Sequence, residues 1–178
     1  KTVLGDFDNA NFVYEGVTTS FYRKGDEYWV KTDNENGELQ DYRVAYVFGV
    51  YPLQQLLLPI QNGRLNALSI AWDARNTSEG GQRWYHIYEN QEPVTSESPL
   101  HWTGIYHNWN SRCAECHSTN VVKGYDGTRR QYTTTYDQIN VGCEACHGPG
   151  SRHVELANAG KIDRSQSSAE MGLALSLA

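Results

Sequence analysis

The chain has 178 residues, which is enough for one hydrophobic core, or for one core with a small appended lobe. Its formal charge is −6 and its 15 basic residues are scattered, which argues against nucleic acid or an anionic membrane surface as a partner. No apolar run approaches the length of a membrane span, and no signal peptide is visible. The chain as given is therefore predicted to be cytoplasmic or already processed.

Residues 11–50 are predicted to form an antiparallel β meander, because aromatic and β-branched residues alternate there with period two. Turn signals at 15–16, 24–26 and 34–37 separate the strands. The alternating positions are Phe12 and Tyr14, then Tyr28 and Val30, then Tyr42, Val44, Tyr46, Phe48 and Val50.

A hairpin is predicted at the Asn-Gly pair of residues 62–63, which is the strongest two-residue turn signal in the chain. It joins residues 56–60 to residues 65–72, whose large apolar side chains share one face. The whole stretch 1–78 contains neither Cys nor His. We interpret it as a β-rich scaffold lobe that carries little chemistry.

Residues 79–178 are predicted to be loop-rich with short helices, since glycines and prolines interrupt every longer element. All six His and all four Cys of the chain lie in this part. The alternation of Leu173, Leu175 and Leu177 favours a strand in the tail. The predicted fold class is therefore α+β, an N-terminal antiparallel meander followed by a chemically active region, within one continuous structural unit.

The chemically active region contains the pattern Cys-x-x-Cys-His twice, at Cys113–His117 and at Cys143–His147. Two such pairs could supply four thiolates to a structural zinc ion, but 26 residues separate them, against about 15 to 20 in the usual spacing. A disulfide within either pair would close a small strained loop. A thioredoxin-like redox pair requires a βαβ context that this stretch lacks.

Covalent attachment of haem explains the whole pattern, including the histidine. Two thiols separated by two residues reach the two vinyl groups on one edge of a porphyrin. The next residue then lies beneath the iron, where His supplies an axial nitrogen. The sequence therefore predicts two covalently bound haem c groups, held by Cys113, Cys116, Cys143 and Cys146, with His117 and His147 as proximal iron ligands.

Segments along almost the whole chain carry a family resemblance: "VLGDFDNANFVYEG", "YVFGVYPLQQ", "GGQRWYHIY", "PLHWTG", "NWNSRCAECHSTN" and "INVGCEACHGPGSRHVE". With these segments the chain resembles a family of multihaem c-type cytochromes, many of which are fused to helical tetratricopeptide repeats. The resemblance implies electron transfer outside the cytoplasmic membrane. Members usually carry a further haem motif before this region and a longer part after it. We therefore expect either a reduced form or a longer gene product.

The remaining histidines are candidates for the distal iron positions. His153 is favoured, because the Gly-Pro-Gly turn at 148–150 separates it from His147 by too few residues for both to bind opposite faces of one haem. We expect it to bind the iron held by His117. His101 and His86, each beside aromatic residues, compete for the other iron, and His107 is the least favoured. Candidate partners for the haem propionates are Arg112, Arg129, Arg130 and Arg152.

The predicted function is electron transfer through two closely spaced bis-His haems, as part of a longer periplasmic or extracellular relay. The alternative is a redox enzyme that acts on a small inorganic substrate at an open haem site. Redox proteins or further copies of the chain are the expected partners. The strand-like ends "KTVLGDF" and "GLALSLA" suggest pairing of copies into a filament, a homopolymer with stacked haems.

Overall fold

The computed structural model describes residues 2–163 and 165–173. They divide into two compact units, which we describe separately. The β unit comprises residues 1–112 together with 126–132, and the motif unit comprises 113–125 together with 133–178. The first break between these units lies after residue 112, and the strands on either side of residue 78, β8 (Ile70–Asp73) and β9 (Arg83–His86), are antiparallel partners within the β unit.

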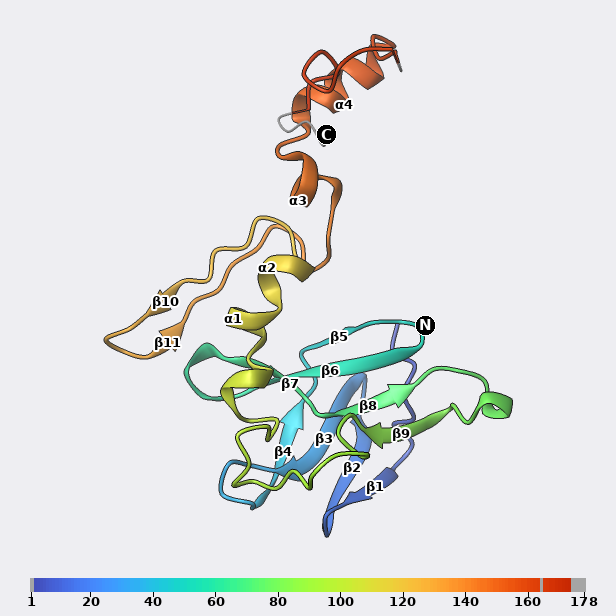
Figure 1. Ribbon diagram of the computed structural model, residues 1–178, viewed down its shortest axis with the longest axis vertical. Helices are drawn as coiled ribbons and strands as arrows, with labels where there is room; N and C mark the ends of the chain where they lie inside the picture. The colour runs from blue at the N-terminus through green and yellow to red at the C-terminus, as the bar shows by residue number, and fades with distance from the viewer. Residues whose placement is uncertain (1, 164, 174–178) are drawn as a thin grey trace. The chain divides into compact units, whose positions relative to one another are not determined.

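The first sheet of the β unit is a four-stranded antiparallel meander in the order β1-β2-β3-β4, as predicted for this part of the chain (Figure 1). Left-handed residues form its tight turns, at Glu15-Gly16 and Gly25, and Gly37 serves the next turn. Its strands are β1 (Ala10–Tyr14), β2 (Val17–Lys24), β3 (Glu27–Asp33) and β4 (Leu39–Arg43).

The second sheet has the order β5-β6-β8-β9, with β7 paired to β6. The predicted Asn-Gly hairpin is confirmed, since Asn62 and Gly63 are left-handed and β6 and β7 pair antiparallel around them. The strands are β5 (Tyr46–Phe48), β6 (Leu53–Pro59), β7 (Leu65–Ala67), β8 (Ile70–Asp73) and β9 (Arg83–His86). A separate two-stranded sheet pairs β10 (Tyr125–Asp126) with β11 (Gln131–Tyr132).

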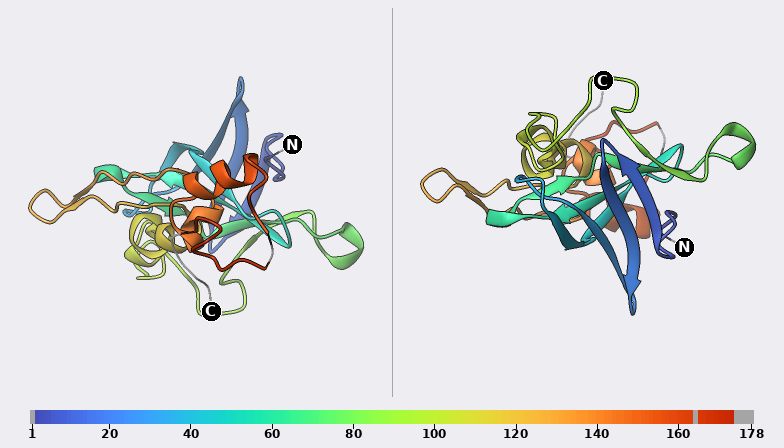
Figure 2. Two further views of the ribbon diagram at one scale, coloured as in Figure 1. Left: turned by 90° about the horizontal axis from the view of Figure 1, so that it is seen from above. Right: turned by 90° about the horizontal axis from the view of Figure 1, so that it is seen from below.

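The strands of the two sheets in the β unit cross at a steep angle, and the core lies between them (Figure 2). Aromatic rings dominate this core. Trp84 stacks on Phe21 with ring centroids 3.7 Å apart, and Phe7 and Trp72 contact Trp84 edge-on. The cluster of buried hydrophobic residues is Phe7, Phe21, Val30, Tyr42, Leu56, Leu58, Leu68, Ile70, Trp72, Trp84 and Trp102.

Helices are few and short, which is consistent with the predicted α+β class. In the β unit they are the 3-10 turns η1 (Gln61–Gly63), η2 (Thr77–Glu79) and η3 (Ile105–His107), and helix α1 (Trp109–Arg112). In the motif unit they are α2 (Ala114–His117), α3 (Cys143–His147) and α4 (Ser151–Asn158). Among the described residues, no helix has the length and apolarity that a membrane crossing requires.

The alternating positions from Tyr42 to Val50 do not belong to one sheet, because β4 ends at Arg43 in the first sheet and β5 begins at Tyr46 in the second. The chain leaves the first sheet and joins the second within this run. Val44 N–H donates to the carbonyl of Tyr28 in the first sheet, and the next residue, Ala45, donates to Leu57 in the second. Alternation in the sequence does not reveal such a transfer, because the letters keep a period of two whereas the side chains that pack on the core here are Val44 and Val47, three positions apart.

The N-terminal end differs from the strand-like end that the sequence suggested. Residues 2–9 form no strand. Instead, Leu4 N–H donates to the side-chain oxygen of Gln54 at 2.9 Å, and Phe7 is buried in the core. At the other end, residues 168–172 form turns, and the predicted strand positions Leu175 and Leu177 lie outside the described residues.

Candidate functional site

Each Cys-x-x-Cys-His motif forms one short helical turn in the motif unit. Cys113 precedes α2, and its carbonyl accepts from the N–H groups of Cys116 and His117. Gly142 precedes α3, which contains the whole second motif. Because residues three and four apart share one face of a helix, both turns place two thiols and an imidazole on the same side.

None of the four cysteines, all of them among the described residues, forms a disulfide, and three of them, Cys116, Cys143 and Cys146, are exposed. Throughout the described part of the chain, no three or more His, Cys, Asp or Glu side chains gather in a group that could hold a metal ion. Among the described residues the four cysteines thus form neither disulfides nor a four-thiolate cluster. Exposed thiols on a helical turn suit covalent attachment to a large external group.

Two residues that follow the first motif connect it to the segment that precedes the second. The Thr119 hydroxyl donates to the carbonyl of Asn140 at 2.9 Å and accepts from the N–H of Gly142 at 2.8 Å. The Ser118 hydroxyl donates to the carbonyl of Ile139 at 3.1 Å. Backbone bonds between Thr119 and residues 137 and 138 reinforce this link. The two motifs are thus held together by a buried hydrogen-bond network that ends one residue before Cys143.

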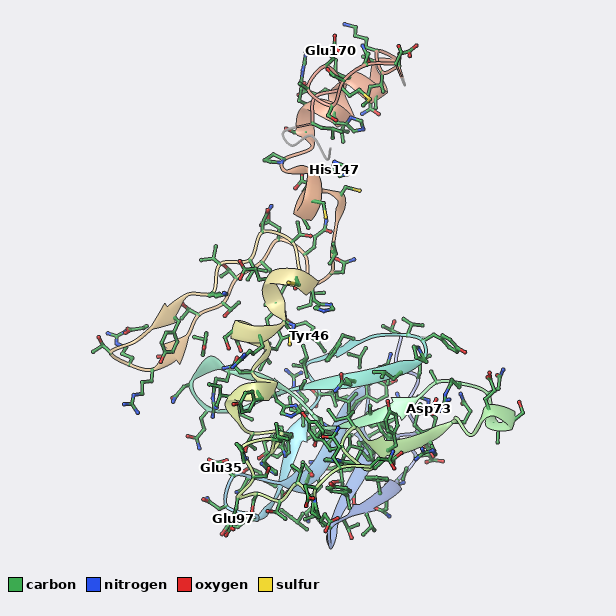
Figure 3. All side chains as sticks on the ribbon, in the orientation of Figure 1. Glu35, Tyr46, Asp73, Glu97, His147 and Glu170 are labelled. Atoms are coloured by element: carbon green, nitrogen blue, oxygen red, sulfur yellow. The ribbon has the colours of Figure 1, made fainter. Side chains whose placement is uncertain are left out.

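The second motif borders a hollow of about 540 Å³ whose walls are mostly apolar. Cys143, His147, His153, Val154 and Leu173 contribute to its lining. The Nδ1 atom of His147, the residue labelled at α3 in Figure 3, is buried and has no hydrogen-bond partner among the described residues. An unsatisfied buried nitrogen beside an apolar hollow marks a site that a further group completes. These residues fit a haem bound to the second motif.

His153, on α4, is held in the form that a ligand to iron requires. Its Nδ1–H donates to the carbonyl of Met171 at 2.8 Å, so the lone pair of Nε2 remains available. Gly172 makes this contact possible. It is left-handed, and a Cβ at this position would lie 2.9 Å from the backbone nitrogen of His153.

His86, one of the two competing distal candidates, lies in the β unit and is buried. Its ring stacks on Tyr14 with centroids 3.7 Å apart, and its Nδ1 accepts from the N–H of Tyr88. Burial, and secondarily the nearby His107, lower the pKa of His86 to about 4, so the imidazole is neutral at neutral pH. A neutral imidazole is the form that binds iron.

His101, the other candidate, has both ring nitrogens engaged within the β unit. Nε2 donates to a carboxylate oxygen of Asp33 at 3.1 Å, and Nδ1 lies 2.8 Å from the hydroxyl of Thr103. The Nε2 of His107 contacts the carbonyl of Leu100, and burial lowers the pKa of His107. The three histidines of the β unit are therefore mainly bound to protein groups.

Three of the four arginines predicted to meet haem propionates have other partners in the structure. Arg152 pairs with Glu155 at 3.1 Å, and Arg129 lies 3.7 Å from Asp126. The guanidinium of Arg112 lies over the ring of Tyr106. Exposed pairs of this kind contribute little stability and exchange readily, so these arginines stay candidates.

The motif unit has almost no core made of its own side chains. Of its described residues only Ala114, Ser118 and Thr119 are buried, and two of these three are polar. Sequence inspection missed this feature and the roles of Ser118, Thr119 and Gly172. The polar "STN" that follows the first motif was the available signal for the first two.

Residues 72–148 match the family model described as cytochrome c554 and c-prime. The matched stretch contains both Cys-x-x-Cys-His motifs and covers less than half of the chain. The match supports a c-type cytochrome with covalently bound haem and a role in electron transfer. Neither the curated proteins nor the solved structures give a match.

Proposed function

We propose that the protein is a dihaem c-type cytochrome that carries electrons through two closely spaced, six-coordinate haems. When bound, haem c supplies a one-electron iron couple whose potential depends on the axial ligands, burial and nearby charge. The observation that carries the proposal is the composition of the motif unit. With three buried residues among those described, it lacks the apolar area that normally stabilises a segment of this size. Two covalently held porphyrins would supply that area.

In this proposal the chain's own residues have three tasks. The four cysteine thiols form thioether bonds, and His117 and His147 each present one ring nitrogen to an iron. The hydrogen bonds of Thr119 keep the two attachment turns at a fixed separation. Rapid exchange between two redox centres requires such a short, rigid separation, and the network supports it.

His153 is the proposed distal ligand of the iron held by His117. The Met171 carbonyl fixes its tautomer and orients its ring, as accessory groups do for metal-binding histidines. Its place in the lining of the hollow beside Cys143 and His147 supports a position near the haems.

For the second distal position, His86 and His101 stay the proposed donors. The contacts within the β unit favour His86 over His101 as this donor. His101 would have to give up its bond to Asp33 or to Thr103, whereas in the described structure His86 has a bonded partner at Nδ1 only.

We further propose a periplasmic or extracellular location, because covalent haem attachment takes place after export, and a place in a longer electron relay. Association of copies into a filament stays part of the proposal. The structure of the N-terminal segment supports this association less than its sequence suggested, since Leu4 and Phe7 are engaged within the β unit. Sedimentation and electron microscopy of the native protein test this point.

Low-temperature EPR of the oxidised protein, with haem quantitation, tests the main proposal. Two low-spin ferric haems per chain with bis-imidazole g-values are expected. A high-spin signal from one haem, together with tight nitrite or cyanide binding, would instead favour an enzyme with an open iron. A preparation without covalently bound haem would overturn both.

A further inference from the structure

Glu144 lies inside the second motif, at a position that the attachment chemistry leaves unrestricted. Its side chain nevertheless makes a defined contact, since Oε1 accepts from the backbone N–H of Gly150 at 2.7 Å. Glu144 is half-buried and contributes to the lining of the hollow that His147 and His153 also border. The contact is thus made within the hollow that two of the proposed iron ligands share.

The turn that follows the second motif is bonded to Glu144 at both ends. The Glu144 carbonyl accepts from the N–H of Gly148 at 3.0 Å, and its carboxylate accepts from the N–H of Gly150. Gly148 has φ 72° and ψ −170°, a conformation that residues with a Cβ rarely adopt. Backbone of this kind keeps its shape only where its surroundings hold it, and Glu144 supplies a hydrogen bond at the first and at the last residue of the turn.

Gly150, the last residue of this turn, is also where helix α4 starts. Its carbonyl accepts the first bond of the helix, from the N–H of Val154 at 3.0 Å. His153 is the third residue of the helix, so the place of its Cα follows from the place of Gly150 and the direction of the helix. A negative charge near the first turn of a helix is stabilising, which strengthens the contact with Glu144. The position of His153 relative to the second motif therefore depends on the Glu144 side chain.

The two contacts that hold His153 in place have different effects. The Met171 carbonyl accepts from its Nδ1–H at 2.8 Å and so fixes the tautomer and the rotation of the ring. The Glu144 carboxylate acts on the backbone in front of α4 and so fixes the distance between this helix and α3. An iron ligand requires both contacts, because a correctly turned ring that lies too far from the iron does not bind it.

We propose that Glu144 is a positioning residue for His153 and that it couples the two haem sites. It belongs to the attachment turn of one haem and sets the place of the distal ligand of the other, whose iron is held by His117. The role of Glu144 rests on the assignment of His153 under the proposed function. A substitution in the second motif that leaves its cysteines and its histidine intact should therefore loosen the distal ligand of the first haem.

Binding of cyanide to the oxidised, haem-loaded protein measures how firmly His153 holds its iron, because cyanide must displace it. In Glu144→Ala, cyanide affinity should rise by about tenfold at one haem, since hydrogen bonds to charged groups contribute about this factor. The EPR signal that shifts should be the one that His153→Ala changes. Glu144→Gln keeps an acceptor oxygen at the same reach and should bring the affinity back to within about threefold of the parent protein. Unchanged cyanide affinity in a haem-loaded Glu144→Ala protein would overturn the proposal.

Two further variants separate positioning from a general loosening of the motif unit. In Glu144→Ala/His153→Ala, cyanide should bind as in His153→Ala alone, because the positioned ligand is gone, and additive effects of the two substitutions would overturn the proposal. Glu115→Ala removes a carboxylate from the first motif, where its partner is Lys123 at 2.7 Å, and should leave cyanide affinity unchanged. An equal rise in Glu115→Ala would mean that lost charge, and not lost positioning, is the cause, and would also overturn the proposal.

The same titration distinguishes failure of this role from failure of the proposed function. If His153→Ala leaves cyanide affinity unchanged, the assignment of His153 is wrong and the role of Glu144 is overturned with it. If His153→Ala opens an iron and Glu144→Ala has no effect, the role of Glu144 alone is overturned. Should Glu144→Ala fail to bind haem, Glu144→Asp replaces it, because its carboxylate is one methylene too short to reach Gly150, and parent-like cyanide affinity in that variant would contradict the proposal.

Discussion

The β unit and the motif unit are stabilised in opposite ways. In the β unit, two crossed sheets enclose a cluster of eleven buried hydrophobic residues, among them three tryptophans. In the motif unit, buried hydroxyls and backbone groups make the defining contacts, and Ala114 is the one buried apolar residue among those described. On the proposed function, covalently bound haem would supply the apolar surface that the motif unit lacks, whereas the β unit supplies its own.

Removal of the attachment thiols should have the largest effect, and it should affect the motif unit and not the β unit. In Cys143→Ala/Cys146→Ala, one haem should be lost and the motif unit should become sensitive to proteases, because its bound group is part of its fold. The β unit should stay resistant. Pyridine haemochrome assay and limited proteolysis measure the two effects, with Val141→Ala, a change at an exposed neighbouring position, as control. Retention of both haems by the double variant would contradict the account.

Truncation of Trp84, a tryptophan of the core cluster, should destabilise the β unit and not the motif unit. Trp84→Ala removes contacts with Phe21, Phe7 and Trp72 and a hydrogen bond to the carbonyl of Asp6, and it should lower the unfolding free energy of the β unit by about 3–5 kcal/mol. Haem content should not change. Denaturant unfolding followed by tryptophan fluorescence measures the loss.

The matched control for Trp84 is Trp29→Ala. Trp29 is half-buried, and Lys24 lies 4.0 Å above its ring, a contact with an expected contribution of about 0.5–1 kcal/mol. If the two variants were equally destabilised, the aromatic cluster would not be the source of stability in the β unit.

Loss of His153 should change the spectrum of one haem and leave its attachment intact. In His153→Ala, one low-spin ferric haem should become high-spin, and added imidazole should restore the low-spin signal. Gly172→Ala should give a weaker form of the same change, because its Cβ would displace the segment that carries the Met171 carbonyl from His153. An unchanged EPR spectrum in His153→Ala would mean that His153 binds no iron.

Removal of the Thr119 hydroxyl, which links the two motifs, should have a smaller effect than the loss of His153. Thr119→Val keeps the shape of the side chain but leaves Gly142 N–H and the Asn140 carbonyl without their partner, which should cost about 1–3 kcal/mol of motif-unit stability. It should also alter the Soret circular dichroism that reports haem–haem coupling. Thr133→Val, at an exposed hydroxyl with one bond to Gly124, should change neither.

The smallest predicted effect is the alkaline sensitivity of the β unit. Burial, aided by the charges of Glu35 and Asp33, raises the pKa of Tyr42 from about 10 to about 12. Between these values the unfolded chain has already released this proton and the folded chain has not, so stability falls as the pH rises from 10 to 12. The fall should be shallower in Tyr42→Phe. Thermal unfolding across this range measures it, and identical profiles would show that Tyr42 contributes nothing to it.

Local patterns predicted the meander, its turns and the hairpin at Asn62-Gly63, because alternation and left-handed turn residues are encoded within a few positions. They did not predict the transfer of the chain between sheets at Val44, which depends on partners far away in sequence, Tyr28 and Leu57.

The proposed attachment residues of the candidate site follow from spacing alone, since haem chemistry fixes two cysteines and a histidine within five positions. The residues that organise these side chains could not be predicted from spacing. Thr119 and Gly172 act through contacts with Gly142 and His153 that only the folded motif unit brings together. The distal ligands from the β unit stay predictions, because burial and aromatic neighbours fit a structural histidine equally well.

Hydrogen–deuterium exchange of the haem-loaded protein, compared with the same chain produced without haem, tests the central claim most directly. The account predicts that amides of the β unit keep their protection in both forms, while amides of residues 113–125 and 133–163 are protected only when haem is bound. Equal protection of the motif unit in the two forms would contradict the claim that bound haem is its core.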